Sequence, residues 1–285
     1  MKDYIKLLRV KHYLKNFLIF VPLFFSQQLY EKEAFIKTTI LFIVFSLFAS
    51  SVYIFNDIID RNKDKLHEVK KNRPIASGKI SIKNAVIAMI VLYVIGLIIG
   101  VAGRIKTECW ELIIGYIILN VLYSIKLKKI PVIDVFVLVM FYIIRLVLGC
   151  LSSNSVLSFW MFMAVLTGSF YMGYGKRRNE LNTKGNTREV LKYYNKEFLN
   201  QNMYICMGMM IMFYALWCND INTINRIGTN KQMWTIPLVL ITAQRYSLDI
   251  EKSKFADPIN IITGDKWLIA FSIAYVAIMY LIIYD

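Results

Sequence analysis

Histidine and cysteine are scarce in this 285-residue sequence, and their scarcity argues against several kinds of site. The two histidines, His12 and His67, do not form a metal-ligand pair, and no nucleophile–histidine pair is evident. No CxxC motif joins any two cysteines, so neither a zinc site nor a disulfide framework is predicted. The cysteines stand in or beside apolar segments and are expected to be small core residues. They are Cys109, Cys150, Cys206 and Cys218.

Charged residues are also few. Only 19% of the residues are charged, whereas 57% are hydrophobic and occur in long blocks that a soluble core does not require. A bilayer core takes about 20 apolar residues per helix, and runs near that length recur along the whole chain. The sequence therefore predicts an all-α polytopic membrane helical bundle, a single integral membrane domain over residues 1–285.

Nine apolar segments are candidate membrane spans. The first contains Pro22 and two glutamines, and the eighth has only a short apolar run before Arg245, so either could be a re-entrant or core-buried segment instead. The nine candidates are residues 17–30, 36–58, 84–103, 109–124, 131–151, 156–174, 203–219, 233–247 and 267–284.

Basic residues fall mostly on one side of these spans. Most of the 34 lysines and arginines lie in the N-terminal segment and in the loops after spans two, four, six and eight. The positive-inside rule makes these parts cytoplasmic, in a multi-pass protein of the cell membrane. The net charge of +15 follows from this topology and from attraction to anionic lipid, so no nucleic-acid partner is expected. Residues 188–202 are predicted to form an amphipathic helix on the cytoplasmic membrane surface.

Three aspartates close the second span. Asp57, Asp60 and Asp64 are spaced i, i+3 and i+7, which places them within about 60° of one helix face, and Asn56 lies beside that face. Ionised carboxylates cost about 2.5–3.5 kcal/mol each at the centre of a membrane helix, and less near its end. A solvated helix end explains one aspartate easily but three on a stripe less well, so a compensating cation is favoured.

Magnesium suits such a cluster. Hard oxygen ligands without neighbouring His or Cys are typical of Mg²⁺, which keeps waters and takes further ligands from substrate phosphates. The basic side chains that follow could hold a diphosphate as it leaves, although a cytoplasmic loop is basic in any case. They are Lys65, Lys70, Lys71 and Arg73, before a turn marked by Pro74 and Gly78.

The pattern Asn56-Asp57-x-x-Asp60-x-x-x-Asp64, followed by RPIASG at 73–78, resembles the first signature of the UbiA superfamily of intramembrane prenyltransferases. Residues 9–25, 122–149, 173–181 and 244–248 are similar to its decaprenyl-phosphate phosphoribosyltransferase subfamily. The resemblance covers nearly the whole chain. It implies nine helices around a central cavity that opens laterally to the membrane, with the active site at the cytoplasmic end.

The sequence departs from the superfamily at the second signature. Prenyltransferases that use prenyl diphosphates carry a DxxxD-type motif there, whereas Lys176, Arg177 and Glu180 occupy the place in this chain. Fixed cations suit substrate phosphates, and Glu180 could orient either of them on a continuing helix. The soluble substrate that the subfamily implies, 5-phosphoribosyl 1-diphosphate, has a 5-phosphate besides its diphosphate, so extra cations fit it.

By this resemblance the protein is an enzyme that transfers a 5-phosphoribosyl group from 5-phosphoribosyl 1-diphosphate to a polyprenyl phosphate of the decaprenyl kind, with Mg²⁺ as cofactor. Negative charge builds on the diphosphate as the anomeric bond breaks, so catalysis depends on neutralising the leaving group. The acceptor phosphate is already anionic at neutral pH, so a general base is not strictly required.

Roles for individual residues follow as hypotheses. The three aspartates would hold Mg²⁺, and Asn56 would position the donor. Lys176 and Arg177 would bind donor phosphates, joined by Lys71 or Arg73.

A second group of candidates has both a functional and a structural interpretation. Lys15 and Asn16 could meet the acceptor phosphate or the donor, or be an interfacial lysine and a helix cap. Arg145 lies within an apolar span, where it should pair with a carboxylate or a substrate phosphate, the structural partner being favoured. Further candidates for substrate contact, each with a structural alternative, are Tyr123, Lys126, Asp134 and Arg245.

Two other functions stay open. A UbiA-type prenyltransferase would move a prenyl chain from prenyl diphosphate to an aromatic or other small acceptor, although the basic pair at 176–177 argues against it. A lipid-phosphate transporter or a non-catalytic membrane scaffold belongs to a different class, and charged pockets are expected there too.

Overall fold

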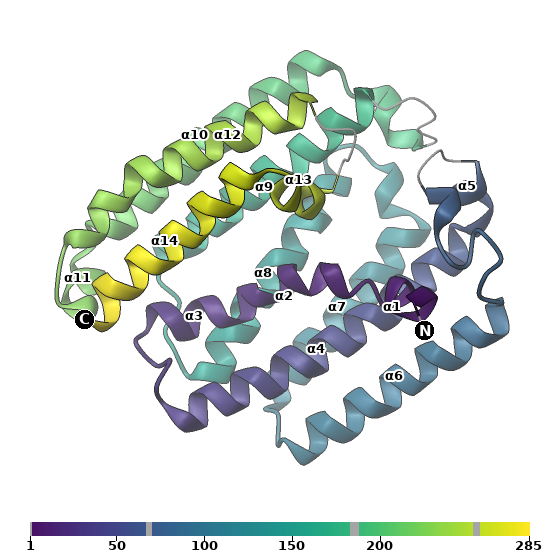
Figure 1. Ribbon diagram of the computed structural model, residues 1–285, viewed down its shortest axis with the longest axis horizontal. Coiled ribbons are helices and arrows are strands. Elements are labelled where there is room, and N and C mark those ends of the chain that lie inside the picture. The colour runs from purple at the N-terminus through teal and green to yellow at the C-terminus, as the bar shows by residue number, and fades with distance from the viewer. Residues whose placement is uncertain (1, 67–69, 183–187, 253–256) are drawn as a thin grey trace.

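The computed structural model describes residues 2–66, 70–182, 188–252 and 257–285, and within these ranges every regular element is helical. The long helices run roughly alongside one another (Figure 1). The prediction of an all-α fold is therefore confirmed.

Within the described chain, the second to ninth predicted spans each correspond to a long helix. These helices are α4 (Lys32–Ile59), α6 (Ile82–Ala102), α7 (Thr107–Ile125), α8 (Ile133–Ser153), α9 (Phe159–Asn182), α10 (Lys196–Cys218), α12 (Ile236–Lys252) and α14 (Lys266–Tyr284). Five of them, α4, α6, α7, α8 and α14, are long and apolar enough to cross a membrane, and α10 with α11 (Ile221–Ile227), bent by 57°, would make a sixth span. The chain is a multi-pass membrane protein, while the number of nine crossings stays a prediction.

Two outer helices indicate which solvent surrounds the bundle. The most apolar stretches of α6 and α14 are only 22% and 17% buried inside the protein. Leaving that much apolar surface in water would be unfavourable, whereas lipid accommodates it. The corresponding stretches of α4 and α8 are 61% and 67% buried, so these two helices lie at the centre of the protein.

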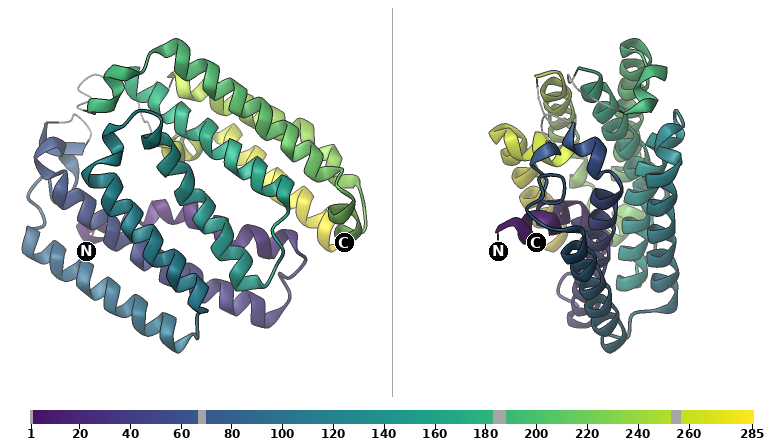
Figure 2. Two further views of the ribbon diagram at one scale, coloured as in Figure 1. Left: turned by 180° about the vertical axis from the view of Figure 1, so that it is seen from behind. Right: turned by 90° about the vertical axis from the view of Figure 1, so that its right-hand side faces the viewer.

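Aromatic side chains pack between neighbouring helices. The ring of Tyr116 on α7 lies 4.8 Å from Phe45 on α4 and 5.2 Å from Phe141 on α8. Tyr171 and Tyr246 belong to a second cluster, which joins α9, α10 and α12, and α9 and α10 lie side by side in Figure 2. The ends of α4, α9 and α12 that carry polar residues gather at the same end of the molecule (Figure 1).

The N-terminal segment, residues 2–25, is a series of short helices. They are α1 (Lys2–Leu8), the 3₁₀ turn η1 (Val10–His12), α2 (Tyr13–Asn16), the 3₁₀ turn η2 (Phe17–Ile19) and α3 (Phe20–Phe25), of which η2 and α3 lie within the first predicted span. Serines of α4 hold this N-terminal segment, because Ser50 donates to the Leu8 carbonyl at 2.8 Å and Asn16 donates to Ser46 at 2.9 Å. None of the described helices in this segment is long enough by itself to span a membrane, so the crossing at residues 17–30 stays a prediction.

Other short elements connect the long helices. They are α5 (Arg61–Lys65), η3 (Lys70–Asn72), η4 (Leu127–Lys129), η5 (Glu189–Tyr193), η6 (Lys231–Thr235) and α13 (Pro258–Gly264). The predicted surface helix at 188–202 is wrong, since the 3₁₀ turn η5 precedes α10 there. Val190, Leu191 and Leu199 are buried against α9 and α12, so protein contact explains the apolar spacing that had suggested lipid contact.

Gly149 on α8 lets the N-terminal segment approach closely. A Cβ atom at this position would lie 2.3 Å from the Ile19 carbonyl oxygen and 2.9 Å from Pro22. We expect Gly149→Ala to lower the thermal unfolding midpoint in detergent, because such overpacking costs about 1–3 kcal/mol. Gly115→Ala on α7, where a Cβ would meet nothing within 4 Å, is the matched control and should keep or raise the midpoint. Equal midpoints for the two variants would contradict this packing.

Candidate active site

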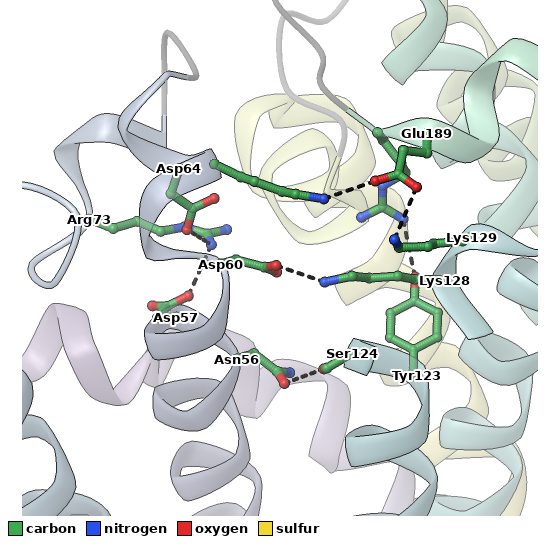
Figure 3. A network of polar contacts seen from close by, with 12 residues as sticks. Asn56, Asp57, Asp60, Asp64, Arg73, Tyr123, Ser124, Lys128, Lys129 and Glu189 are labelled. Carbon is green, nitrogen blue, oxygen red and sulfur yellow. Dashed lines mark hydrogen bonds and ion pairs between the residues drawn. The ribbon is translucent and has the colours of Figure 1, made fainter. Parts of the chain in front are cut away.

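The three aspartates of the sequence pattern lie at one end of α4. Asp57 is in its last turns, Asp60 ends the helix, and Asp64 lies on α5 (Figure 3). The Asp64 amide donates to the Asp60 carbonyl at 2.8 Å, so the helical path continues and the predicted stripe is kept. The side chains of Asp57 and Asp64 are only 3% and 6% exposed, whereas that of Asp60 is 30% exposed.

Arg73 joins two of these aspartates. Its Nη1 atom donates to Asp57 at 2.9 Å and to Asp64 at 2.7 Å (Figure 3). The turn after it depends on Gly78, whose φ of 77° is a left-handed conformation that glycine adopts readily. Burial raises the pKa of Asp64 above its ordinary value, and the Arg73 guanidinium opposes that shift. The RPIASG element thus belongs to the same site as the aspartates.

Two further basic side chains pair with the aspartates. Arg9, from the N-terminal segment, forms an ion pair with Asp57, and its guanidinium lies 5.2 Å from the ring centre of Tyr53. Lys128 of η4 places its Nζ atom 2.7 Å from Asp60. Each aspartate is therefore paired with at least one fixed cation, which offsets the cost of removing the carboxylate from water.

A bridge of polar contacts connects the aspartate-bearing helices to the opposite wall. Ser124 of α7 donates to Asn56, and Glu189 of η5 accepts from Lys63 and Lys129, each at 3.1 Å (Figure 3). These contacts fix α4 and α5 relative to α7 and η5.

The donor set suits magnesium, although the carboxylates do not already form a metal cluster. In the part of the chain that the structure describes, no group of three or more Asp, Glu, His or Cys side chains is arranged to hold a metal ion. Asp57 and Asp64 nevertheless converge on a single guanidinium nitrogen, as two oxygen ligands converge on a cation. Carboxylate oxygens without His or Cys are the ligands that Mg²⁺ prefers, so these residues fit this ion.

Lys176 and Arg177 are neighbours on α9 but have different environments, because successive helical residues point about 100° apart. Lys176 lines the central cavity and makes no hydrogen bond or ion pair with other described residues. Arg177 is fully buried and pairs with Asp134 of α8 and, at 2.6 Å, with Glu180, which also lines the cavity. Tyr194 donates to Asp134 at 2.6 Å. Arg177 and Asp134 thus tie α8 to α9 outside the cavity lining.

Arg145 has a partner other than the carboxylate that the sequence suggested. Its Nε atom donates to Asn16 at 2.8 Å, and its guanidinium lies 4.8 Å and 5.3 Å from the ring centres of Phe45 and Tyr116. No carboxylate among the described residues pairs with it. An amide and two aromatic faces therefore take that place. Arg145 lines the cavity, and Asn16 lies behind it.

The remaining candidates lie in two different places. Tyr123 lines the cavity and accepts hydrogen bonds from Arg177 and Arg188, both at 3.1 Å. Lys71, Lys126 and Arg245 are not part of the lining. Lys71 and Lys126 are exposed, and Arg245 pairs with an aspartate at the start of α14.

Several polar residues of the lining were not predicted from the sequence. Among them are Arg9, His12, Lys128, Arg188 and Asp257. Asp257 precedes a proline at the start of α13, and that pattern is typical of an ordinary helix cap. The four basic residues lie in segments that the positive-inside rule already expects to be basic. Their presence in the sequence therefore gave no separate indication of a binding site.

The site consists of two adjoining cavities. The polar cavity has a volume of about 800 Å³ and is lined by ten lysine and arginine side chains and five carboxylates. An apolar cavity of about 610 Å³ lies between the N-terminal segment, α9, α10 and α13. The two share Lys15, Tyr142, Met172 and Pro258. Such an arrangement can hold a polyanion beside a hydrocarbon chain.

Known proteins match both the sequence and the fold. Residues 18–218 match the model of the UbiA prenyltransferase family. Decaprenyl-phosphate phosphoribosyltransferase of Corynebacterium glutamicum is 29% identical, over 98% of this chain and 86% of its own. The uncharacterized protein y4nM of Sinorhizobium fredii is 34% identical over 63% of this chain, and the match covers only 34% of y4nM.

A solved structure has the same arrangement of helices. The UbiA homolog from Archaeoglobus fulgidus bound to GPP and Mg²⁺ superposes with a TM-score of 0.72 at 16% identity, over 99% of this chain and 100% of that chain. This likeness establishes the fold, and the family match extends over most of the sequence. The protein therefore belongs to the UbiA prenyltransferase family of membrane-embedded transferases.

Proposed function

We propose that this enzyme transfers a 5-phosphoribosyl group from 5-phosphoribosyl 1-diphosphate to a polyprenyl phosphate and releases diphosphate. The observation that carries the proposal is the excess of cations in the polar cavity, beside an apolar cavity of similar size. A donor with three phosphate groups suits the first cavity, and a lipid suits the second. The name of the Corynebacterium glutamicum relative contains the same acceptor class and the same transferred group.

The reaction exchanges one bond at the anomeric carbon for another. The diphosphate leaves with the electrons of the broken C–O bond, and an oxygen of the acceptor phosphate forms the new one. Stabilising the charge on the diphosphate is the main task of the protein. Asp57, Asp60 and Asp64 would hold Mg²⁺, which when bound supplies positive charge at that place. Arg9 and Arg73, already beside the aspartates, would contact the same phosphates.

The same proposal places the polar cavity at the cytoplasmic side of the cell membrane, with the N-terminus on that side. The aspartates and the end of α9 lie at one end of the bundle, from which the basic loops also leave. The positive-inside rule supports this orientation.

Turnover with the two substrates tests the proposal directly. Purified protein incubated with radiolabelled 5-phosphoribosyl 1-diphosphate, polyprenyl phosphate and Mg²⁺ should form a labelled lipid, and chelation of the metal should stop its formation. Prenyl diphosphate with a small aromatic acceptor is the comparison reaction. Product from the second pair but not the first would show that the enzyme moves prenyl chains instead.

Neutralising one aspartate should weaken metal binding and lower the rate of turnover. We expect Asp57→Asn to lower kcat by at least about 100-fold, because a group that supports leaving-group stabilisation is lost. Mg²⁺ with diphosphate should raise the unfolding midpoint of the wild type but not of this variant. Glu33→Gln, at a carboxylate that is 78% exposed and pairs with Lys37, is the control and should behave as the wild type. Turnover that survives Asp57→Asn would contradict the role of this carboxylate, whereas lipid-phosphate transport or binding that survives it, without any Mg²⁺-dependent turnover in the wild type, would favour a transporter or scaffold.

Substitutions of Lys176 and Arg177 on α9 should have different effects on stability and on turnover. Arg177→Gln leaves the Asp134 and Glu180 carboxylates without their buried partner, so we expect about 3–5 kcal/mol of destabilisation and a lower unfolding midpoint. Lys176→Gln removes a side chain that has no pairing partner among the described residues, so the midpoint should hold while turnover falls. The reverse pattern, a stable Arg177→Gln and an unstable Lys176→Gln, would refute these roles.

A further inference from the structure

We propose that the junction of the two cavities binds the phosphate of the lipid acceptor, with Lys15 and Lys176 as its cations and Asp257 as the residue that positions Lys15. This inference rests on the proposed function and deepens it, because it states which part of the site takes the acceptor. In this proposal Lys176 binds the acceptor phosphate, whereas the sequence had suggested that it binds a donor phosphate.

The position of the junction suits an anionic head on a hydrocarbon tail. The two cavities share Lys15, Tyr142, Met172 and Pro258, and Lys15 is the only charged residue of these four. A ligand whose tail lies in the apolar cavity would therefore have its head at Lys15. A phosphate on a long polyprenol has this shape and charge.

Asp257 fixes the position of the Lys15 ammonium group. The Lys15 Nζ atom lies 3.2 Å from Oδ2 of Asp257, whose other oxygen accepts the Ile259 amide at 3.0 Å at the start of α13. The two side chains are mostly buried, with 17% and 20% exposed. An ammonium group has three N–H donors, so this tether leaves donors for a phosphate.

Lys176 reaches the same space from α9. It lies one helical turn after Met172, which lines both cavities, and it shares the lining of the polar cavity with Asp257. Burial alone would raise the pKa of Asp257, but the nearby charges, chiefly Lys15 and Lys176, lower it below its ordinary value. Lys176 pairs with none of the described residues. A half-buried ammonium without an anion is costly, and a phosphate monoester brings about −1.5 to −2 charges at pH 7. Lys15, which is held by Asp257, and Lys176, which has no pairing partner among the described residues, together match the charge of the phosphate monoester.

The 5-phosphate of the donor has the same chemistry, and the surroundings favour the lipid. The apolar cavity begins at Lys15, with walls that include Phe17, Val165 and Met210. The cations that pair with the aspartates, among them Arg73 and Lys128, line the polar cavity only, whereas Lys15 lines both cavities. The proposal therefore assigns the diphosphate to the first group of cations and the acceptor phosphate to Lys15 and Lys176.

Lipid binding tests the inference without turnover. Dissociation constants would be measured for full-length protein in nanodiscs with a polyprenyl phosphate and with the corresponding uncharged polyprenol. The wild type should bind the phosphate lipid at least about 10-fold more tightly, because charged hydrogen bonds are lost with the alcohol. Lys15→Gln, Lys176→Gln and Asp257→Asn should each remove most of that preference. Lys37→Gln, outside both cavities, is the matched control and should keep it.

Steady-state kinetics supply a second readout that a merely structural role would not move. Asp257→Asn keeps a side-chain oxygen for the Ile259 amide, so the start of α13 should stay intact and the unfolding midpoint should hold. We expect the KM for polyprenyl phosphate to rise at least about 10-fold in this variant, with little change in the KM for the phosphoribosyl donor.

The outcomes separate this inference from the proposed function. An unchanged preference for the phosphate lipid in all three variants would overturn the inference. A rise in the donor KM instead of the lipid KM would also overturn it, and would place the 5-phosphate at the junction. A phosphate preference that the variants abolish, in a wild type that transfers no phosphoribose, would refute the proposed function and leave the lipid-phosphate site standing.

Discussion

The contact of Arg73 with two nearly buried carboxylates, Asp57 and Asp64, is the interaction on which the polar half of this molecule depends. Carboxylates at the end of a membrane helix carry a desolvation cost that a matched cation must offset. Arg9 from the N-terminal segment and Lys128 from η4 complete the compensation. The fold thus draws three separate parts of the chain to one acidic stripe, and a cavity that can hold polyanions forms beside it.

The charged residues in and beside this cavity fall into two groups: those in ion pairs that hold helices together, and those that we propose bind substrates. Arg177 is fully occupied by Asp134 and Glu180, so it holds α8 and α9 together. Lys176, one residue earlier, faces the cavity without a partner among the described residues. The two side chains look alike in sequence, and their 100° separation on the helix gives them different roles. The same division separates the cations at the aspartates from the lysines at the apolar cavity.

Patterns that span few residues were predictable from the sequence, and contacts between distant segments were not. The long apolar runs predicted the long helices, and the i, i+3, i+7 spacing predicted the aspartate stripe, because both follow from helical geometry alone. The packing of the N-terminal segment against α4 serines and Gly149 joins residues that are remote in sequence. Asp257 resembles an ordinary helix cap until the fold brings Lys15, more than two hundred positions earlier, into contact with it.

The most direct test of the central claim is the position of a bound metal. Mn²⁺ can replace Mg²⁺ and scatters anomalously, so a crystal structure of the protein with Mn²⁺ and diphosphate would locate it. The account predicts a metal peak about 2.1 Å from oxygens of the Asp57, Asp60 or Asp64 carboxylates, with Arg73 moved toward the diphosphate. Arg73 still joined to both Asp57 and Asp64, with the metal and diphosphate elsewhere, would contradict it.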